Sequence, residues 1–253
     1  MKPIQPQIAI SVRKIGFPET IIEPFFLFRK DIELKAHPAY ALAKSGDADA
    51  AIALVGDLAW DFVSRVSAMC PPDTIFVAPH AREATGDNAI PQVLASACAV
   101  LAHGEVDVDI VQVTRVFHTG ADPMERMSLR PEFEGDVSLG RQYALVDDVT
   151  TMGGTLAELA NYIQCAGGIV VAAIVLVNAG RTGKFHPSRK VIRDLEMRYE
   201  NEITEIFGIA INCLTADEAN YLIGFRSTDE IRNRLAKARQ ETDIRLRSKG
   251  IFR

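Results

Sequence analysis

The sequence predicts an α/β fold, a doubly wound and mostly parallel sheet covered by helices, and two observations support it. Short apolar runs bounded by turn residues recur through the middle of the chain, as buried parallel strands require. Segments with apolar residues at helical spacing lie between these runs. A repeated order of strand, helix and strand is typical of a doubly wound sheet.

The expected elements of the central part, residues 71–180, follow from these patterns. The strands are expected at residues 74–79, 108–113, 143–148 and 168–180. The helices are expected at 89–103 and 155–167, and the second of them ends at a glycine pair suited to a C-cap.

The N-terminal part, residues 1–70, is expected to form an accessory region, or hood, beside this core. Residues 37–66 predict one or two helices broken near Gly46, with Asp47 as the N-cap of the second. The strand-like stretches "IAISVRKI" and "EPFFLFR" are expected to form a small accessory layer. Six aromatic residues either pack in a core or stack on a ligand: Phe25, Phe26, Phe28, Tyr40, Trp60 and Phe62.

The C-terminal part, residues 181–253, is expected to be largely helical. Its closing helix, "STDEIRNRLAKARQETDIRLRSK", begins with a Ser227 cap and has acids in its first turn and cations in its last. An apolar stripe is expected to pack on the body or on a second subunit, and consists of Ile231, Leu235, Ala238 and Leu246. Residues 225–253 hold nine basic residues against four acidic ones, so contact with nucleic acid is a weaker alternative.

Composition restricts the class of protein. The chain has 253 residues, 48% of them hydrophobic, and a net charge of -5, which does not suggest a nucleic-acid binder overall. No apolar run reaches the ~18 residues that a membrane span needs, and "MKPIQPQIAI" does not read as a signal peptide, so a cytoplasmic location is expected. The four cysteines are scattered without a C-x-x-C pair, which predicts buried free thiols rather than zinc ligands or disulfides.

The stretch "YALVDDVTTMGGTL", residues 143–156, carries the predicted chemistry. A strand that ends at Asp147 and Asp148 is followed by a tight loop and a helix N-terminus, where free N–H groups and the helix dipole bind anions. Threonine hydroxyls add donors, and glycines allow close approach. Two carboxylates would repel a bare phosphate, so we expect them to accept hydrogen bonds from sugar hydroxyls, with a magnesium ion nearby. The stretch therefore predicts a ribose 5-phosphate site.

This stretch resembles the phosphoribosyl pyrophosphate (PRPP) signature of type I phosphoribosyltransferases. The resemblance implies that PRPP is bound by Asp147, Asp148, Val149, Thr150, Thr151, Met152, Gly153, Gly154 and Thr155. Met152 stands where the signature often has threonine, so one side-chain donor is missing. Mg²⁺ is the implied cofactor, and Asp147 is a candidate ligand for it.

Two further segments fit the resemblance. "VAPHAREATGDNAIPQVLA", residues 77–95, is similar to the family's pyrophosphate loop, in the form found in the competence protein F-like branch, although the zinc-binding cysteines of that branch are missing. Ala81 and Arg82 would then contact pyrophosphate; the alternative is that Arg82 and His80 are solvated turn residues.

Residues 115–135 are long and polar, and lie where the family has a flexible loop that closes over the reacting sugar. Arg126 and Arg130 are the candidates in this loop for contacting pyrophosphate. The alternative is that they form surface ion pairs with Glu125 or Glu132.

The resemblance implies a phosphoribosyltransferase that transfers ribose 5-phosphate from PRPP to a nitrogenous base and releases pyrophosphate. Asp147 and Asp148 would hold the ribose, while Arg82 and Arg126 would stabilise the leaving group. The expected partners are PRPP, a small base and a second copy of the chain in a homodimer. Neither nucleic acid nor a membrane is an expected partner. The alternative is a non-catalytic PRPP or nucleotide sensor, which could contact nucleic acid through its basic C-terminal helix.

Overall fold

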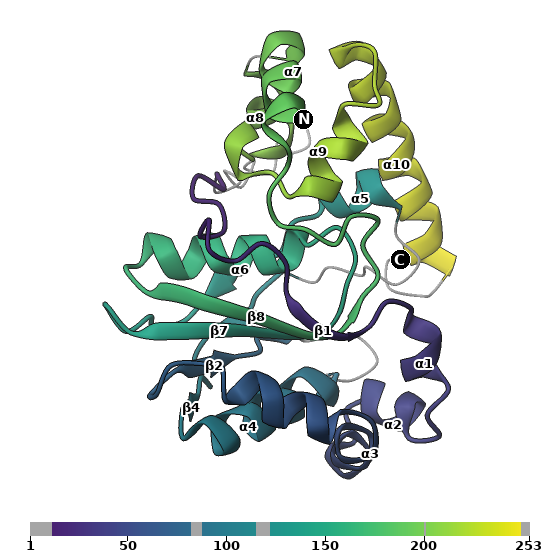
Figure 1. Ribbon diagram of the computed structural model, residues 1–253. Helices are drawn as coiled ribbons and strands as arrows, with labels where there is room; N and C mark the ends of the chain where they lie inside the picture. The colour runs from purple at the N-terminus through teal and green to yellow at the C-terminus, as the bar shows by residue number, and fades with distance from the viewer. Residues whose placement is uncertain (1–11, 82–87, 115–121, 200, 249–253) are drawn as a thin grey trace, which may run out of the picture.

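The computed structural model describes residues 12–81, 88–114, 122–199 and 201–248, and its centre is the predicted α/β fold. Five strands form a sheet in the order β1-β8-β7-β2-β4, and every neighbouring pair is parallel (Figure 1). These strands are β1 (Phe25–Phe28), β2 (Ile75–Val77), β4 (Glu105–Val106), β7 (Gln142–Thr150) and β8 (Ile169–Asn178). A smaller sheet has the order β3-β5-β6 and contains β3 (His80–Ala81), β5 (Val111–Gln112) and β6 (Phe133–Glu134).

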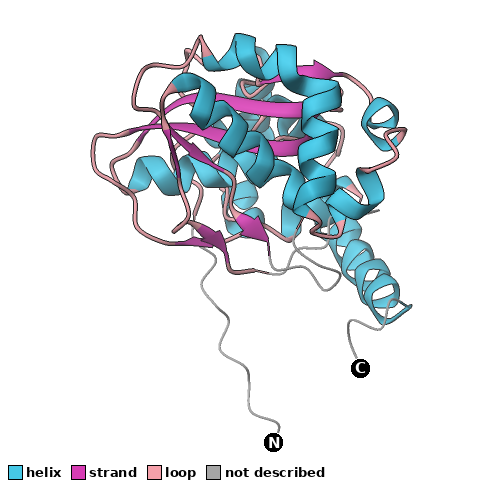
Figure 2. Ribbon diagram, turned by 90° about the horizontal axis from the view of Figure 1, so that it is seen from below, coloured by secondary structure: helices cyan, strands magenta, loops and turns pink. Residues whose placement is uncertain are grey.

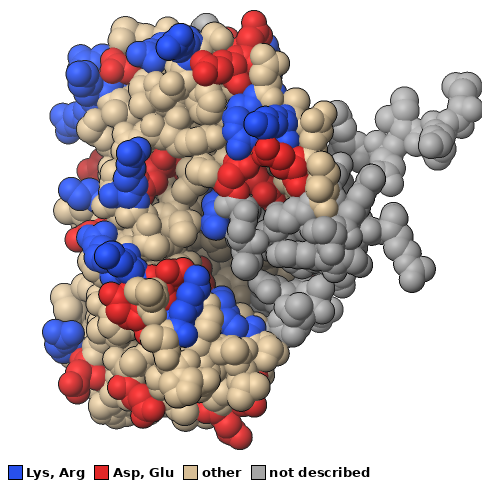
Figure 3. All heavy atoms as spheres, turned by 90° about the vertical axis from the view of Figure 1, so that its right-hand side faces the viewer, with Lys and Arg blue, Asp and Glu red and all other residues tan. Residues whose placement is uncertain are grey.

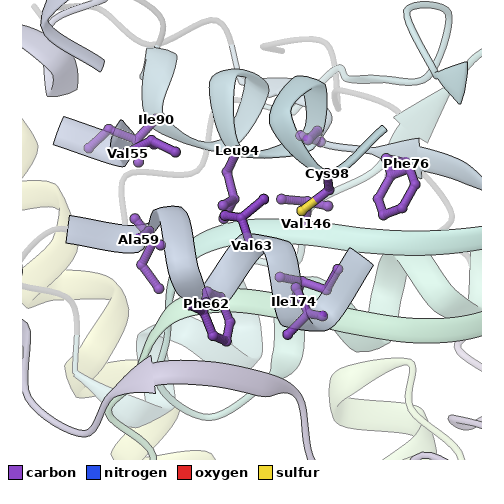
Figure 4. Packing of buried hydrophobic residues seen from close by; sticks show 14 of the residues in the cluster. Val55, Ala59, Phe62, Val63, Phe76, Ile90, Leu94, Cys98, Val146 and Ile174 are labelled. Atoms are coloured by element: carbon purple, nitrogen blue, oxygen red, sulfur yellow. The ribbon is translucent and has the colours of Figure 1, made fainter. Parts of the chain in front are cut away.

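Helices cover both faces of the main sheet, which confirms the doubly wound arrangement. One face carries α3 (Ala48–Ser67) and α4 (Ala89–Ala102), and the other carries α6 (Gly154–Cys165), as Figure 1 shows. Figure 2 views the molecule from below, from the side of α3 and α4. Figure 4 shows the apolar packing of the first layer, where Leu94 and Cys98 of α4 lie beside Val63 of α3 and Val146 of β7. Burial of these side chains fixes both helices on the sheet.

The predicted helix break near Gly46 is confirmed. The helix α2 (Tyr40–Lys44) ends before Gly46, whose φ is 103°, and α3 begins directly after Asp47. The Asp47 side chain accepts a hydrogen bond from the Ala50 N–H at 2.9 Å. It thereby satisfies one of the unpaired donors of the first turn of α3.

Replacing Asp47 with alanine should therefore lower the free energy of unfolding by about 1 kcal/mol, because the N-cap acceptor is lost. Urea unfolding followed by circular dichroism measures this change. Asp61→Ala, an exposed change inside the same helix, is the matched control and should stay within about 0.5 kcal/mol of the parent. Equal effects of the two substitutions would contradict the capping role.

The expectation that "EPFFLFR" forms an accessory layer is wrong. Its residues 25–28 form β1, which pairs in parallel with β8 at the edge of the main sheet. Four adjacent apolar residues predict a strand, but they cannot specify its partner, because register depends on contacts with a strand about 150 residues away. Phe62 is buried in the core, whereas Trp60 is exposed. The division of the chain at residues 70 and 180 stays a prediction.

The strand expected at 108–113 is also corrected. Only Val111 and Gln112 are in a strand, and they belong to the smaller sheet, while residues 105–106 form the edge strand β4 of the main sheet. The Asp107 carboxylate accepts hydrogen bonds from the N–H groups of Asp109, at 3.1 Å, and Ile110, at 2.8 Å. This Asx-type turn separates β4 from β5, so the run cannot continue as one strand.

The C-terminal part is helical, as predicted. Its helices are α7 (Arg189–Tyr199), α8 (Glu202–Phe207), the 3₁₀ turn η1 (Ile211–Cys213), α9 (Ala216–Leu222) and α10 (Thr228–Ser248). Ser227 caps α10 by accepting a hydrogen bond from the Glu230 N–H at 3.2 Å. The side chains of Ile231, Leu235 and Ala238 are buried in one cluster, which also contains Met124 and Met127 of α5 (Pro123–Ser128). The apolar stripe of α10 therefore packs on the body, while the side chain of Leu246 lies outside the described residues.

All four cysteines are free. Cys98 and Cys213 are buried and Cys70 is half-buried, but Cys165 is exposed, which corrects the expectation that all four are buried. Burial raises the pKa of the Cys98 thiol to about 12. Among the described residues, no helix is both long and apolar enough to cross a membrane.

Candidate functional site

A cavity of about 340 Å³ lies next to the carboxyl end of β7. The acid pair and the loop after it form one part of its wall. The helix α5 and the segment that follows it form a second part, and α1 (Asp31–Lys35) with α2 contributes Lys35, Tyr40 and Lys44. Segments from the N-terminal part, from β7 and from the region of α5 therefore meet at one place, where open α/β sheets bind their ligands.

The loop between β7 and α6 has the geometry of an anion site. The helix α6 begins at Gly154, and Gly153 in the N-cap position has a φ of 78°, a left-handed conformation that glycine adopts without strain. The Ala157 N–H donates to the Gly153 carbonyl at 2.9 Å, so the first turn of the helix is formed. The preceding N–H groups of the loop have no intrahelical acceptor and can bind a phosphate. Met152, Gly153, Gly154 and Thr155 all line the cavity, and their contact with PRPP stays a prediction.

The acid pair lies inside β7, which continues to Thr150, rather than at the end of the strand. Asp148 is buried and Asp147 is half-buried, and both line the cavity. The Asp147 carboxylate accepts a hydrogen bond from the Asp148 N–H at 2.8 Å. Burial, together with the neighbouring charge of Asp148, raises the pKa of Asp147 to about 8.

Lys44 is the counterion of the acid pair, and no local sequence pattern indicates this role. Its Nζ lies 2.7 Å from the Asp148 Oδ2, and its side chain also lines the cavity. Burial acts against the charged ammonium group, but Asp148 and Asp147 outweigh it and raise the pKa of Lys44. About 100 residues separate Lys44 from Asp148 in the chain, so no local spacing could indicate this pair.

The raised pKa of Asp147 predicts a specific pH dependence of stability. The folded state holds a proton on Asp147 up to about pH 8, whereas the unfolded chain loses it near pH ~4. The wild-type free energy of unfolding therefore falls as the pH rises through this window. Asp147→Asn removes this loss, so its stability relative to wild type should increase between pH ~4 and pH ~8 by several kcal/mol, since one pKa unit corresponds to about 1.4 kcal/mol. Urea unfolding at both pH values tests this, and a difference independent of pH would contradict it.

Magnesium fits this site only together with a ligand. No group of three or more His, Cys, Asp and Glu side chains within the described ranges could hold a metal ion alone. Mg²⁺ commonly binds through one or two carboxylates plus substrate phosphates, and Asp147 and Asp148 offer such carboxylates at the cavity wall. With a polyphosphate ligand, the ion would neutralise charge on the phosphate oxygens.

The predicted lid arginines have different environments. The Arg126 Nη1 donates to the Thr151 Oγ1 at 3.2 Å. This arginine therefore contacts the candidate phosphate loop, residues 151–154, between β7 and the first turn of α6. Arg130 instead forms two hydrogen bonds of 2.6 Å to Glu158 of α6, and it also donates to the carbonyls of Phe207 and Gly208. Its acidic partner is neither Glu125 nor Glu132. Contact of either arginine with pyrophosphate stays a prediction.

The predicted pyrophosphate loop is only partly described. Arg82 lies outside the described residues, and of His80 and Ala81 only the backbone is described, in strand β3, which pairs in parallel with β5. The roles of Ala81 and Arg82 therefore stay predictions. Downstream, Asn88 caps α4 by accepting a hydrogen bond from the Ile90 N–H at 3.3 Å, and it lines the cavity.

Comparison with known proteins relates the chain to two longer proteins and, over a short segment, to a transferase. No family model matches. Protein TraN of Escherichia coli is 38% identical over 214 residues, which cover 82% of this chain and 48% of that protein. An uncharacterized protein of Haemophilus influenzae is 38% identical over 149 residues, 58% of this chain and 32% of that protein.

The third relative is the orotate phosphoribosyltransferase of Methanothermobacter thermautotrophicus. It is 49% identical over 45 residues, which cover 18% of this chain and 25% of that enzyme. The chain thus spans less than half the length of the two broader relatives, and its similarity to phosphoribosyltransferases is short. Together with the parallel sheet, this similarity hints at a fold like that of the phosphoribosyltransferases.

Proposed function

We propose that the chain is a magnesium-dependent phosphoribosyltransferase that transfers ribose 5-phosphate from PRPP to a nitrogenous base. One observation carries the proposal: the buried acid pair directly precedes a glycine-containing phosphate loop, and both line one cavity. A phosphate site beside two hydroxyl-accepting carboxylates fits a phosphorylated ribose. The short similarity to orotate phosphoribosyltransferases supports the same reaction class.

In the proposed reaction, the bond between C1 of the ribose and the pyrophosphate oxygen breaks, and pyrophosphate leaves with the electron pair. A lone pair on the nitrogen of the base forms the new bond to C1, and where that nitrogen carries a proton, the proton passes to water. Positive charge develops on the ring, so the Asp148 carboxylate, together with Asp147 in its ionised form, would hold the ribose and favour this charge. Binding of the ribose hydroxyls requires Lys44 to release Asp148, since its Nζ lies 2.7 Å from that carboxylate. Arg126, and Arg82 outside the described residues, would stabilise the pyrophosphate.

The base would enter between the N-terminal helices and the lid. Tyr40 and Lys35 line this part of the cavity, as do Phe133 and Gln112 of the smaller sheet. Of the six aromatic residues considered as stacking partners, Tyr40 is therefore the one we propose to contact the base. We also propose that the enzyme is cytoplasmic and homodimeric.

A second candidate function is a non-catalytic sensor of PRPP or of a nucleotide. The observation that favours it is the Lys44–Asp148 pair, which partly neutralises the acid pair without a metal ion. The structure gives less support to nucleic-acid contact through α10. On the side shown in Figure 3, Lys and Arg side chains are interspersed with Asp and Glu over the described surface. Basic residues of α10 have acidic partners: Arg234 pairs with Asp122, the N-cap residue of α5, and with Glu241 of α10. Lys237 also lies beside Glu241.

The deciding experiment is calorimetric titration with PRPP and Mg²⁺, followed by an assay of pyrophosphate release with a panel of purine, pyrimidine and pyridine bases. Binding with release on one base would establish the transferase and identify its acceptor. Binding without release on any base would favour the sensor. Absence of PRPP binding would contradict both the transferase and a sensor of PRPP.

A further inference from the structure

The described residues behind the phosphate loop form a buried polar network that takes no part in the proposed reaction. Thr215 and Glu218, at the start of α9, are 1% and 3% exposed. They form a capping box: the Glu218 N–H donates to the Thr215 Oγ1 at 3.2 Å, and the Thr215 N–H donates to the Glu218 Oε2 at 2.8 Å. Arg13, with no exposed surface, pairs with the same Glu218 carboxylate.

Thr215 also reaches the phosphate loop. Its hydroxyl donates a hydrogen bond to the carbonyl of Met152 at 2.5 Å. The C=O and the following N–H of a trans peptide point in opposite directions, so this bond turns the Gly153 N–H away from α9. Met152 and Gly153 line the cavity, whereas Thr215 does not. The hydroxyl of Thr215 thus holds the orientation of one peptide in the anion site from behind.

The two glycines of the loop are packed closely against the same helix. A Cβ added to Gly153 would lie 3.3 Å from the Thr215 Cγ2, and one added to Gly154 would lie 3.0 Å from the Glu218 Oε1. The loop therefore needs small residues at both positions, for packing against α9 as well as for the positive φ of Gly153. A residue of the C-terminal part thereby restricts the conformation of the phosphate loop.

We propose that Thr215 is a positioning residue for the 5-phosphate of the ribose: its hydroxyl fixes the Met152–Gly153 peptide so that the Gly153 N–H is held for the phosphate. This inference rests on the proposed function. The Thr215 hydroxyl does not replace the side-chain donor missing at Met152, since it donates to the Met152 carbonyl; it holds a backbone donor, the Gly153 N–H, in place. Without it, the peptide can rotate, and the phosphate loses a preorganised donor.

The test compares Thr215→Val, which removes the hydroxyl at similar shape, with Thr215→Ser, which keeps it. The probes are ribose 5-phosphate, which occupies the loop, and pyrophosphate, which does not, each titrated with Mg²⁺ by calorimetry. Thr215→Val should bind ribose 5-phosphate about tenfold more weakly and bind pyrophosphate within about twofold of wild type. Thr215→Ser should bind both like wild type.

Thr204→Val is the matched control. It also removes a hydroxyl that donates to a backbone carbonyl, because the Thr204 Oγ1 donates to the Ile209 carbonyl at 3.1 Å, but this bond does not involve the loop. It should bind both probes like wild type. If Thr215→Val lacks a cooperative unfolding transition, Thr215→Asp replaces it, because aspartate keeps an N-cap acceptor and has no donor when ionised. The same selective loss is expected.

Three results would overturn the inference. Unchanged affinity of Thr215→Val for ribose 5-phosphate would show that the hydroxyl does not position the loop. Equal losses for ribose 5-phosphate and pyrophosphate would show a general structural effect. These two results reject the positioning role alone, whereas wild-type protein that binds neither ribose 5-phosphate nor PRPP rejects the proposed function as well.

Discussion

Replacement of both carboxylates by Asp147→Asn and Asp148→Asn should weaken PRPP binding at least about 100-fold while the protein remains folded. The titration is run above pH 8, where Asp147 is ionised. Each carboxylate is then expected to accept a charge-assisted hydrogen bond from a ribose hydroxyl, and a bond of this kind contributes about 1.5–3 kcal/mol. Loss of both therefore exceeds the ~2.8 kcal/mol that corresponds to a factor of 100. The fold should survive because Asn fits the same space and Lys44 is half-exposed, so its ammonium group can reach water when Asp148 loses its charge.

Calorimetric titration of PRPP with Mg²⁺ measures the binding, and urea unfolding checks the fold. The matched control is Asp49→Asn with Asp61→Asn, which makes the same change of net charge on the exposed face of α3. It should bind PRPP like wild type, apart from a weak long-range effect that salt screens. Unchanged PRPP affinity in the Asp147 and Asp148 double variant would show that the acid pair does not hold the ribose.

The part of the fold that the sequence predicts well depends on local patterns. Asp47 precedes a helical pattern and caps α3, and Gly153 and Gly154 mark the start of α6, because caps and left-handed residues are recognisable over a few positions. The acid pair and its phosphate loop were predicted for the same reason, as adjacent residues on one strand and one helix start. The strand β1 was misplaced because its partner β8 is distant in the chain.

The residues missed at the site have no local signal either. Lys44 is an ordinary lysine at the end of a short helix, and it becomes the partner of Asp148 only when α2 reaches the cavity. Glu158 looks like a solvated helix residue by composition, yet its carboxylate is buried and paired with Arg130. Charged residues are rarely buried, so a single sequence favours the exposed interpretation. Only the three-dimensional structure shows that Glu158 and Arg130 form a buried ion pair.

This buried pairing leads to the second large effect, a loss of stability on Arg13→Met. Arg13 has no exposed surface; its guanidinium bonds the Glu218 carboxylate and lies 3.4 Å from Glu158. Burial opposes its charge, but these two glutamates outweigh it and raise the pKa of Arg13. When Arg13 is lost, Glu158 keeps Arg130, but no other ion pair of the described residues remains for Glu218. Breaking a buried pair in this way typically costs about 3–5 kcal/mol, and we expect that loss in the free energy of unfolding.

The double variant Arg13→Met with Glu218→Gln separates this explanation from lost packing. Removal of both charges leaves no uncompensated carboxylate, so we expect the double variant to recover about half or more of the lost stability. Lys14→Met, an exposed loss of one positive charge at the next position, should change stability by less than about 0.5 kcal/mol. Urea unfolding of the four proteins at one pH measures all three differences. A double variant no more stable than Arg13→Met would contradict the counterion explanation, because the Glu218→Gln side chain can still accept the hydrogen bond from the Thr215 N–H.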